Sequence, residues 1–365
     1  MKVLFTASRI TDQLGFYIDM LTGLNDEPDV TIAFNRDDFE NHDVLLLMGV
    51  DPPVREARRR NPRARVGVVD PRRYEGETLE ADFAIVQGLE QENWFSDYYL
   101  DLFRYDFHPV GPCLPRTHLD VSPIVIGYHG NKVHLHTMFP AVTTALEQLA
   151  GEMAVELRAY FDIETHGELD HELLPRGVRV EQRQWRWDVF DDEFDEIDIG
   201  IVPNTIPIGQ PQRARRAAVT AQPLFNQHET DYLLRFKGTS NAARAYPFAR
   251  RGIPVVADLY PSACHFIEHG VSGMLGGSAG MWYRSLRELA CSAQRREAMG
   301  RRLMRAYQHT MTPEALNPRL AAFLREVCGR EPRAAPPAFQ NASSRLQGRG
   351  FRRATARERR RRRGS

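Results

Sequence analysis

Lysine is almost absent from this chain of 365 residues: it has three lysines, and arginine supplies nearly all other positive charge. Because a bias of this kind follows genome composition, most single arginines carry no functional meaning here. The two interior lysines, Lys132 and Lys237, stand out against that background. They are our first candidates for contact with an anionic ligand.

Cysteine is scarce as well. The four cysteines are widely separated and none forms a CxxC pair, so the sequence predicts neither a disulfide framework nor a zinc site. We expect reduced thiols at Cys113, Cys264, Cys291 and Cys328.

Long apolar runs are also missing. No run approaches the roughly 20 apolar residues that span a bilayer, which excludes a membrane-spanning protein. The short apolar run at the N-terminus is interrupted by Arg9 and Asp12, so it predicts a first strand rather than a signal peptide. We therefore expect a soluble, cytoplasmic protein.

The formal net charge is zero, but the charge is segregated. Residues 331–365 hold eleven arginines and two glutamates, so residues 1–330 carry about −9. This tail is rich in Pro, Ala, Ser, Gly and Arg, a composition with too little apolar surface to fold, and we predict disorder. Two interpretations stay open: an electrostatic contact with nucleic acid, anionic lipid or an acidic partner, and a solvated extension without a partner.

The rest of the chain indicates two α/β domains. Its length exceeds what one hydrophobic core usually supports, and continuous apolar runs separated by helix-length segments are typical of parallel sheets covered on both faces. The first domain is predicted to have strands at 3–6, 30–34, 44–48, 65–69 and 83–86.

Four prolines between Pro109 and Pro123 mark a linker, after which the strand–helix pattern restarts. We predict domains at 1–118 and 119–330, both Rossmann-like and doubly wound. A strand and its loop are expected in PIVIGYHG at 123–130, and further strands at 154–159, 178–181, 197–202 and 254–257, with a long loop at 203–233.

One stretch of the second domain carries a family resemblance. The succession PFARRG, GIPVVAD, LYPSA, HFIEHG and VSGML, between Pro247 and Leu275, resembles the donor-binding segment of the retaining family 4 glycosyltransferases. Trp282 falls at a common tryptophan position of the helix that follows, and PIVIGYHG and DEIDIGIVPN resemble the family's opening strand and its DIGxxP strand. The resemblance implies a GT-B fold, a nucleotide-sugar donor in the second domain and a variable acceptor in the first.

Two loops have the chemistry that a nucleoside diphosphate requires, namely glycines that allow close backbone approach, amide donors and cations. The first follows a predicted strand and the second precedes a helix, positions at which open α/β sheets bind ligands. Their candidate residues are Gly127, Gly130, Asn131 and Lys132 in the first loop, and Lys237, Ser240, Asn241 and Arg244 in the second.

The site departs from the family pattern at two positions. Many members have two glutamates eight residues apart, but Thr239 and Pro247 stand at the matching positions. Ribose would then be bound by another group, with Glu268 or a backbone amide as candidates, and His265 falls where relatives place a polar residue facing the donor.

We do not predict a metal site or a cofactor. His129, His134 and His136 cluster after a strand, but no carboxylate lies nearby at metal-ligand spacing. The acidic string DEIDIG around Asp198 is interpreted as a connector before a strand, and GT-B enzymes as a class generally need no bound divalent ion.

Together these features predict an enzyme, a hexosyltransferase-like glycosyltransferase that retains anomeric configuration and needs no metal. Lys132 and Lys237 would stabilise the departing diphosphate, and His129 would donate to it. Two rivals stay open: a GT-B-like nucleotide-sugar epimerase, and a non-catalytic module whose basic tail binds nucleic acid. The acceptor is left open among a glycan, a lipid-linked intermediate, a protein, a small molecule and a modified nucleic-acid base.

Overall fold

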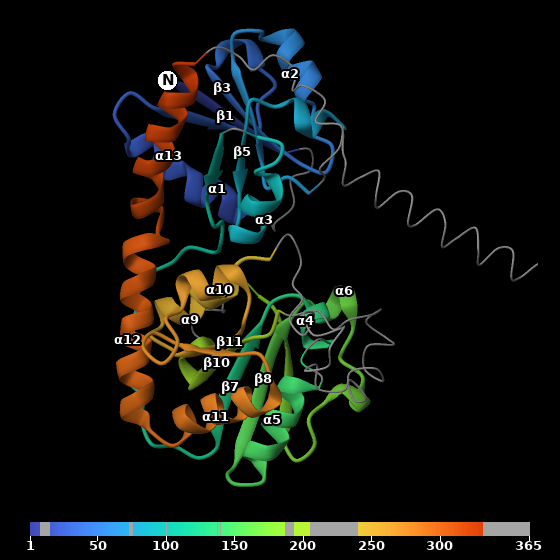
Figure 1. Cartoon of the computed structure of the whole chain (residues 1–365), viewed down its shortest axis with the longest axis vertical. Coiled ribbons are helices and arrows are strands. Elements are labelled where there is room, and N and C mark those ends of the chain that lie inside the picture. Colours follow the sequence, from blue (N-terminus) through green and yellow to red (C-terminus); the bar gives the residue numbers. More distant parts are fainter. Residues whose placement is uncertain are drawn as a thin grey trace, which may run out of the picture.

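The computed structural model describes residues 1–7, 15–72, 76–99, 101–136, 138, 140–186, 193–204 and 240–330. Two α/β domains are stacked along the long axis of the molecule (Figure 1). The arginine-rich tail, Lys237, Thr239 and nearly all of the predicted loop at 203–233 lie outside the described residues.

The first domain is built on a six-stranded parallel sheet with the strand order β2-β1-β3-β4-β5-β6. Its strands are β1 (Lys2–Ala7), β2 (Thr31–Phe34), β3 (Val44–Met48), β4 (Arg65–Val69), β5 (Phe83–Val86) and β6 (Leu102–Arg104). The five predicted strands are confirmed. The sequence did not indicate β6, because its three half-buried residues form no continuous apolar run.

Helices cover both faces of this sheet, as expected for a doubly wound domain. Val3 and Phe5 of β1 pack on one face with α1, whereas Leu4 packs on the other face with α2 and α3. This alternation follows from the two-residue repeat of side-chain direction in a strand. The helices are α1 (Gly15–Thr22), α2 (Val54–Arg60) and α3 (Leu89–Phe95), with 3-10 turns at Gly23–Asp26, Phe39–Asn41 and Gly76–Glu80.

The second domain has a six-stranded parallel sheet with the order β12-β11-β10-β7-β8-β9. Its strands are β7 (Ile124–His129), β8 (Val155–Phe161), β9 (Arg179–Gln184), β10 (Ile199–Val202), β11 (Val255–Asp258) and β12 (Met274–Gly276). The five predicted strands are confirmed within a few residues. Edge strand β12 was not predicted, since it is only three residues long.

Helices again cover both faces. Helices α5 and α11 pack with Ile126 and Leu157 on one face, and α9, α10 and α12 pack around Val255 and Ala257 on the other. The helices are α4 (Lys132–His136), α5 (Ala141–Ala150), α6 (Ile163–His166), α9 (Tyr246–Arg250), α10 (Pro261–Phe266), α11 (Ala279–Ala290), α12 (Ala293–Thr310) and α13 (Pro313–Cys328), with 3-10 turns at His171–Leu173, Phe194–Glu196 and Ala243–Ala245.

The last helix returns to the first domain. Helix α12 runs beside the second sheet and α13 continues beside the first (Figure 1), where Leu320 and Leu324 join the core around β1 and β3. Tyr105 Oη also donates to Asn317 Oδ1 of α13 at 2.8 Å. The predicted range 119–330 therefore groups α13 with the wrong sheet, because its apolar face is buried against the first.

The linker is anchored on the second domain. Arg116 pairs with Asp198 at 3.2 Å, and Asp198 also accepts a hydrogen bond from the Val125 amide at 2.9 Å. Asp198 is therefore a buried structural carboxylate at the start of β10. Within the described part of the chain, no helix combines the length and apolar character needed to cross a membrane.

Candidate functional site

The strand order of the second sheet marks a ligand position. Strand β7 pairs with β8 on one side and β10 on the other, and the chain proceeds outward in opposite directions from these two neighbours. Loops leaving the carboxyl ends of such strands diverge, and the crevice between them is where open α/β sheets bind ligands. The loops at this point begin with Gly130 and Pro203.

The first loop is held in a defined conformation. Gly130 has φ +128, a value that favours glycine, and its amide donates to the Tyr160 carbonyl at 3.0 Å. Tyr128 Oη donates to the Asn131 carbonyl at 2.7 Å, and Asn131 Oδ1 accepts from the Val133 amide at 2.9 Å. Gly127 instead lies inside β7, where a Cβ would meet Ile197 at 2.5 Å. This differs from the prediction that placed Gly127 in the ligand loop.

His129 lies in an aromatic enclosure below this loop. Its ring stacks on Trp185 and meets Phe194 and Phe248 edge to face. Burial lowers the pKa of His129 to about 3, and Nε2 donates to the Arg244 carbonyl at 2.8 Å. His129 is thus a neutral imidazole that holds the second loop. This differs from the predicted role as a donor to a leaving phosphate, because Nε2–H is engaged by a carbonyl.

Lys132 begins α4, and its ammonium group donates to the carbonyls of His166 and Glu168 at 2.7 and 2.6 Å. Two of its three N–H donors therefore fasten the turn after α6. The other lysine of the prediction, Lys237, lies outside the described residues.

The second loop meets the first at Arg244. The Arg244 guanidinium donates to the Pro203 carbonyl at 3.2 Å and to Asn204 Oδ1 at 2.7 Å. Its Cδ packs against Gly130 so closely that a Cβ on that glycine would lie 2.7 Å away. The structure therefore brings together Gly130, Asn131 and Arg244, which the sequence assigned to two separate loops.

A buried chain of hydrogen bonds supports this cation from below. Trp282 Nε1 donates to Asp258 Oδ1 at 3.0 Å, and Asp258 Oδ2 accepts from the Asn204 amide at 2.6 Å. Asn204 in turn binds Arg244. Asn204 and Asp258 were not among the predicted residues. Their position at the carboxyl ends of two predicted strands was the feature of the sequence that could have indicated them.

Nδ2 of Asn204, whose Oδ1 binds Arg244, is buried without a hydrogen-bond partner in the described structure, and so is Oγ of Ser240, which lies beside Gly88 of the first domain. Leaving a buried donor unpaired costs about 1–3 kcal/mol, so such groups are rare and call for an explanation. Pro247, at one of the two positions where the family has glutamate, is buried at the start of α9.

His265 and Glu268 lie in a different place. Both are exposed and line a hollow between α10 and α12 together with Arg302 and Arg305. His265 Nε2 accepts from Arg104 of the first domain at 2.8 Å, and partial burial lowers the pKa of His265. The structure does not group these two residues with Arg244 and Gly130.

The first domain presents a polar cluster at the carboxyl ends of β4 and β5. Asp70 is buried and accepts from Tyr17 Oη at 3.0 Å, from Gln87 Nε2 at 2.7 Å and from Gln91 Nε2 at 3.0 Å, and it also pairs with Arg72. Burial raises the pKa of Asp70, and the Arg72 guanidinium opposes that shift. Sequence inspection did not select this cluster.

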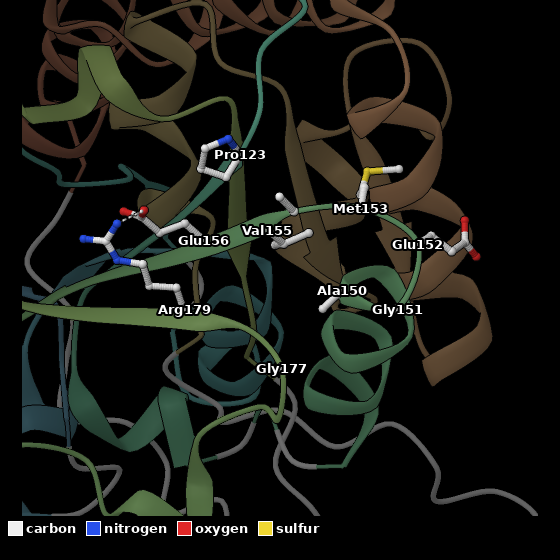
Figure 2. A pocket seen from close by; sticks show the side chains of 10 residues that line it. Pro123, Ala150, Gly151, Glu152, Met153, Val155, Glu156, Gly177 and Arg179 are labelled. Atoms are coloured by element: carbon white, nitrogen blue, oxygen red, sulfur yellow. Dashed lines mark ion pairs between the residues drawn. The ribbon is translucent and has the colours of Figure 1, made fainter.

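Another hollow lies at the opposite end of the second sheet, beside the amino ends of β7, β8 and β9 (Figure 2). Its carboxylates already have partners: Glu156 pairs with Arg179 at 3.4 Å, and Glu152 pairs with Arg287 at 2.7 Å. It is remote from the loops that contain Gly130 and Arg244. Among the described residues, no group of three or more His, Cys, Asp or Glu side chains is arranged to hold a metal ion.

Comparison with known proteins places this geometry in a fold class. A glycosyltransferase from Rickettsia africae superposes with a TM-score of 0.57 at 10% identity, covering 90% of this chain and 99% of that one. The Anabaena protein HepE, solved in complex with UDP and glucose, gives 0.55 at 14% identity, covering 89% and 100%. Sucrose-phosphate synthase from Thermosynechococcus elongatus gives 0.56 at 10% identity, covering 90% and 100%.

These likenesses, together with the two parallel sheets, show that the chain has the two-domain GT-B fold with Rossmann-like sheets. No protein family model matches the sequence. No curated protein matches it in sequence either.

Proposed function

We propose that this protein is a glycosyltransferase that moves a sugar from a nucleoside diphosphate to an acceptor hydroxyl. The observation that carries the proposal is the meeting of Gly130 and Arg244 at the switch point of the second sheet. A glycine loop that admits close approach and a guanidinium held by two acceptors are what a diphosphate requires. The unpaired Nδ2 of Asn204, whose Oδ1 binds Arg244, adds a donor at the same place.

The chemistry proposed for this site is electrostatic. As the bond to the sugar breaks, negative charge builds on the departing diphosphate, and fixed donors aimed at that charge lower the barrier. Among the described residues, the Arg244 guanidinium would be the cation that faces this charge. Lys237 remains a proposed second cation, and Lys132 has one ammonium proton beyond the two that fasten the turn after α6.

Several finer points belong to the same proposal. The resemblance to the retaining family 4 enzymes supports transfer with retention, a hexose donor and independence from metal ions, and a cytoplasmic location is proposed as well. The first domain would bind the acceptor, and a surface polysaccharide is our first choice. The arginine-rich tail is proposed to bind an anionic partner.

UDP is the first probe, since HepE was solved with UDP. We expect UDP, or another nucleoside diphosphate of a small panel, to raise the Tm of the protein, because a ligand bound to the native state stabilises it by mass action. No stabilisation by any member, and no binding by calorimetry, would refute the proposal. With EDTA present, binding and turnover are expected to persist.

Two further experiments separate the rivals. Incubating a nucleotide sugar with the protein and no acceptor is expected to give slow hydrolysis, whereas release of an altered sugar would indicate an epimerase. Turnover retained after deletion of residues 331–365 would exclude a module that works only through its tail.

Lys237→Ala is expected to weaken UDP binding by about 1–3 kcal/mol if the ammonium group makes a desolvated contact.

A further inference from the structure

A buried polar network connects the two domains, and it centres on Asp70. Asp70 lies directly after β4 with φ +48, an uncommon conformation for a residue other than glycine. Donors from Tyr17, Arg72, Gln87 and Gln91 converge on its two oxygens. Asp70 is the acceptor in all four of these hydrogen bonds.

This arrangement fixes the orientation of the Gln87 amide. Nε2 must face Asp70, to which it donates at 2.7 Å, and it also donates to Tyr17 Oη. Oε1 therefore points the other way, toward the second domain, where it accepts from Asn241 Nδ2 at 3.0 Å. Gln87 is only 5% exposed, whereas Asn241 is half-buried, so the bond is partly buried.

Asn241 links Gln87 to the loop that contains Arg244. Because its Nδ2 is directed at Gln87, its Oδ1 faces its own chain and accepts from the Ala243 amide at 3.1 Å. Its carbonyl accepts from Tyr260 Oη at 3.2 Å. These bonds set the start of the turn Ala243–Ala245, whose central residue is Arg244.

The domains approach closely at the next residues. A Cβ on Gly88 would lie 2.7 Å from both the Ser240 carbonyl and Ser262 Oγ, so only glycine allows this approach. Glu90 Oε1 accepts from the Ser262 amide at 2.9 Å, and Leu89 N donates to Ser262 Oγ at 3.0 Å. The Gln87–Asn241 bond thus depends on the spacing of the two domains.

We propose that Gln87 is a positioning residue for the donor site: from the first domain, it orients Asn241 and thereby the turn that presents Arg244. The inference rests on the proposed function for the identity of the ligand. The orientation of the loop that contains Arg244 would then depend in part on the first domain, which would bind the acceptor. The connection runs through Asp70, Gln87 and Asn241.

The test measures UDP affinity by calorimetry in Gln87→Leu, Asn241→Ala and the double variant. We expect each single change to raise the Kd for UDP about fivefold or more, and the double variant to be no weaker than Asn241→Ala, because the bond to Gln87 is already absent in Asn241→Ala. Additive losses, or a Kd within twofold of wild type in Gln87→Leu, would overturn the proposal.

Arg104→Gln is the matched control. It removes the guanidinium that binds His265 across the domains and pairs with Glu92 within the first domain, and both partners lie outside the Arg244 loop. Its Kd for UDP is expected to stay within twofold of wild type. If Arg104→Gln weakens UDP binding as much as Gln87→Leu does, any loss of contact between the domains lowers the affinity. The specific role of Gln87 would then be refuted. If Gln87→Leu does not fold, Gln87→Met is measured in its place with the same thresholds.

A second measurement separates this proposal from the proposed function. Hydrogen exchange at the amides of residues 242–246 is expected to speed up in Gln87→Leu without any ligand, and not in Arg104→Gln. Faster exchange in Gln87→Leu, with no binding of any nucleoside diphosphate of the panel by the wild type, would retain the positioning role and refute the function. Unchanged exchange in Gln87→Leu, with normal UDP binding by the wild type, would refute the positioning role and retain the proposed function.

Discussion

Arg244 Nη2 donates to Asn204 Oδ1 at 2.7 Å, although the two residues are 40 positions apart in the chain. The bond joins the loop after β10 to the turn before α9 and holds the guanidinium beside Gly130. Because Asn204 is itself held by Asp258, the core of the second domain supplies one of the constraints on the position of this cation. Four predictions follow from this arrangement and from the buried groups around it.

Removing the cation should weaken ligand binding. Arg244→Ala is expected to reduce UDP affinity by about 1–3 kcal/mol, the usual loss for a charge-assisted contact, and Arg244→Lys should recover only part because it lacks the planar pair of donors. Calorimetry with UDP measures both. Arg284→Ala, which removes an exposed arginine of α11, is the control and should bind as the wild type does.

Gly130→Ala should damage the same site by crowding. The new Cβ would lie 2.7 Å from Arg244 Cδ at a residue with φ +128, so we expect a loss of about 1–3 kcal/mol in stability and weaker UDP binding. Gly270→Ala is the matched control, since Gly270 has φ +77 but open space around it and lies outside the turn that Lys132 fastens. Equal UDP affinities in the two variants would show that contact with Arg244 is irrelevant.

Trp282→Phe tests the support beneath the site. The change removes the only N–H of the side chain, which donates to the buried Asp258 carboxylate at 3.0 Å, and should cost about 1–3 kcal/mol of unfolding free energy. Thermal unfolding measures the loss, with Trp94→Phe at a 44% exposed position as the control. If the two variants have the same Tm, the hydrogen bond to Asp258 contributes nothing measurable to stability.

Asp106 should make stability depend on pH. Burial raises the pKa of Asp106 to about 7, helped by Glu90 and Glu92 and opposed by the Tyr246 hydrogen bond at 2.5 Å and by Arg104. A carboxyl with a raised pKa in the folded state contributes stability that is present below pH 4 and is lost as pH rises through 7.

Asp106→Asn keeps an acceptor for Tyr246 but cannot ionise. Its Tm relative to wild type is therefore expected to rise by about 2 °C or more between pH 5 and pH 8. A constant difference across that interval would show that Asp106 keeps one protonation state throughout.

The sequence by itself determined the fold class and most of the strands. Continuous runs such as Val44–Met48 and Arg65–Val69 are buried on both faces, and an apolar segment of that length between turns has few alternatives to a central parallel strand. The short edge strands β6 and β12 escaped prediction because pairing with a neighbour, rather than their own composition, makes them strands.

The tertiary structure decided which polar residues form the site. Gly130 and Arg244 were selected from the sequence, but their contact depends on the order β10-β7 in the sheet, which local patterns do not encode. His129 looked available for chemistry and proved to be enclosed by aromatic rings. Gln87 had no local signal at all: its role arises only because Asp70 and Asn241, far apart in sequence, lie on opposite sides of its amide.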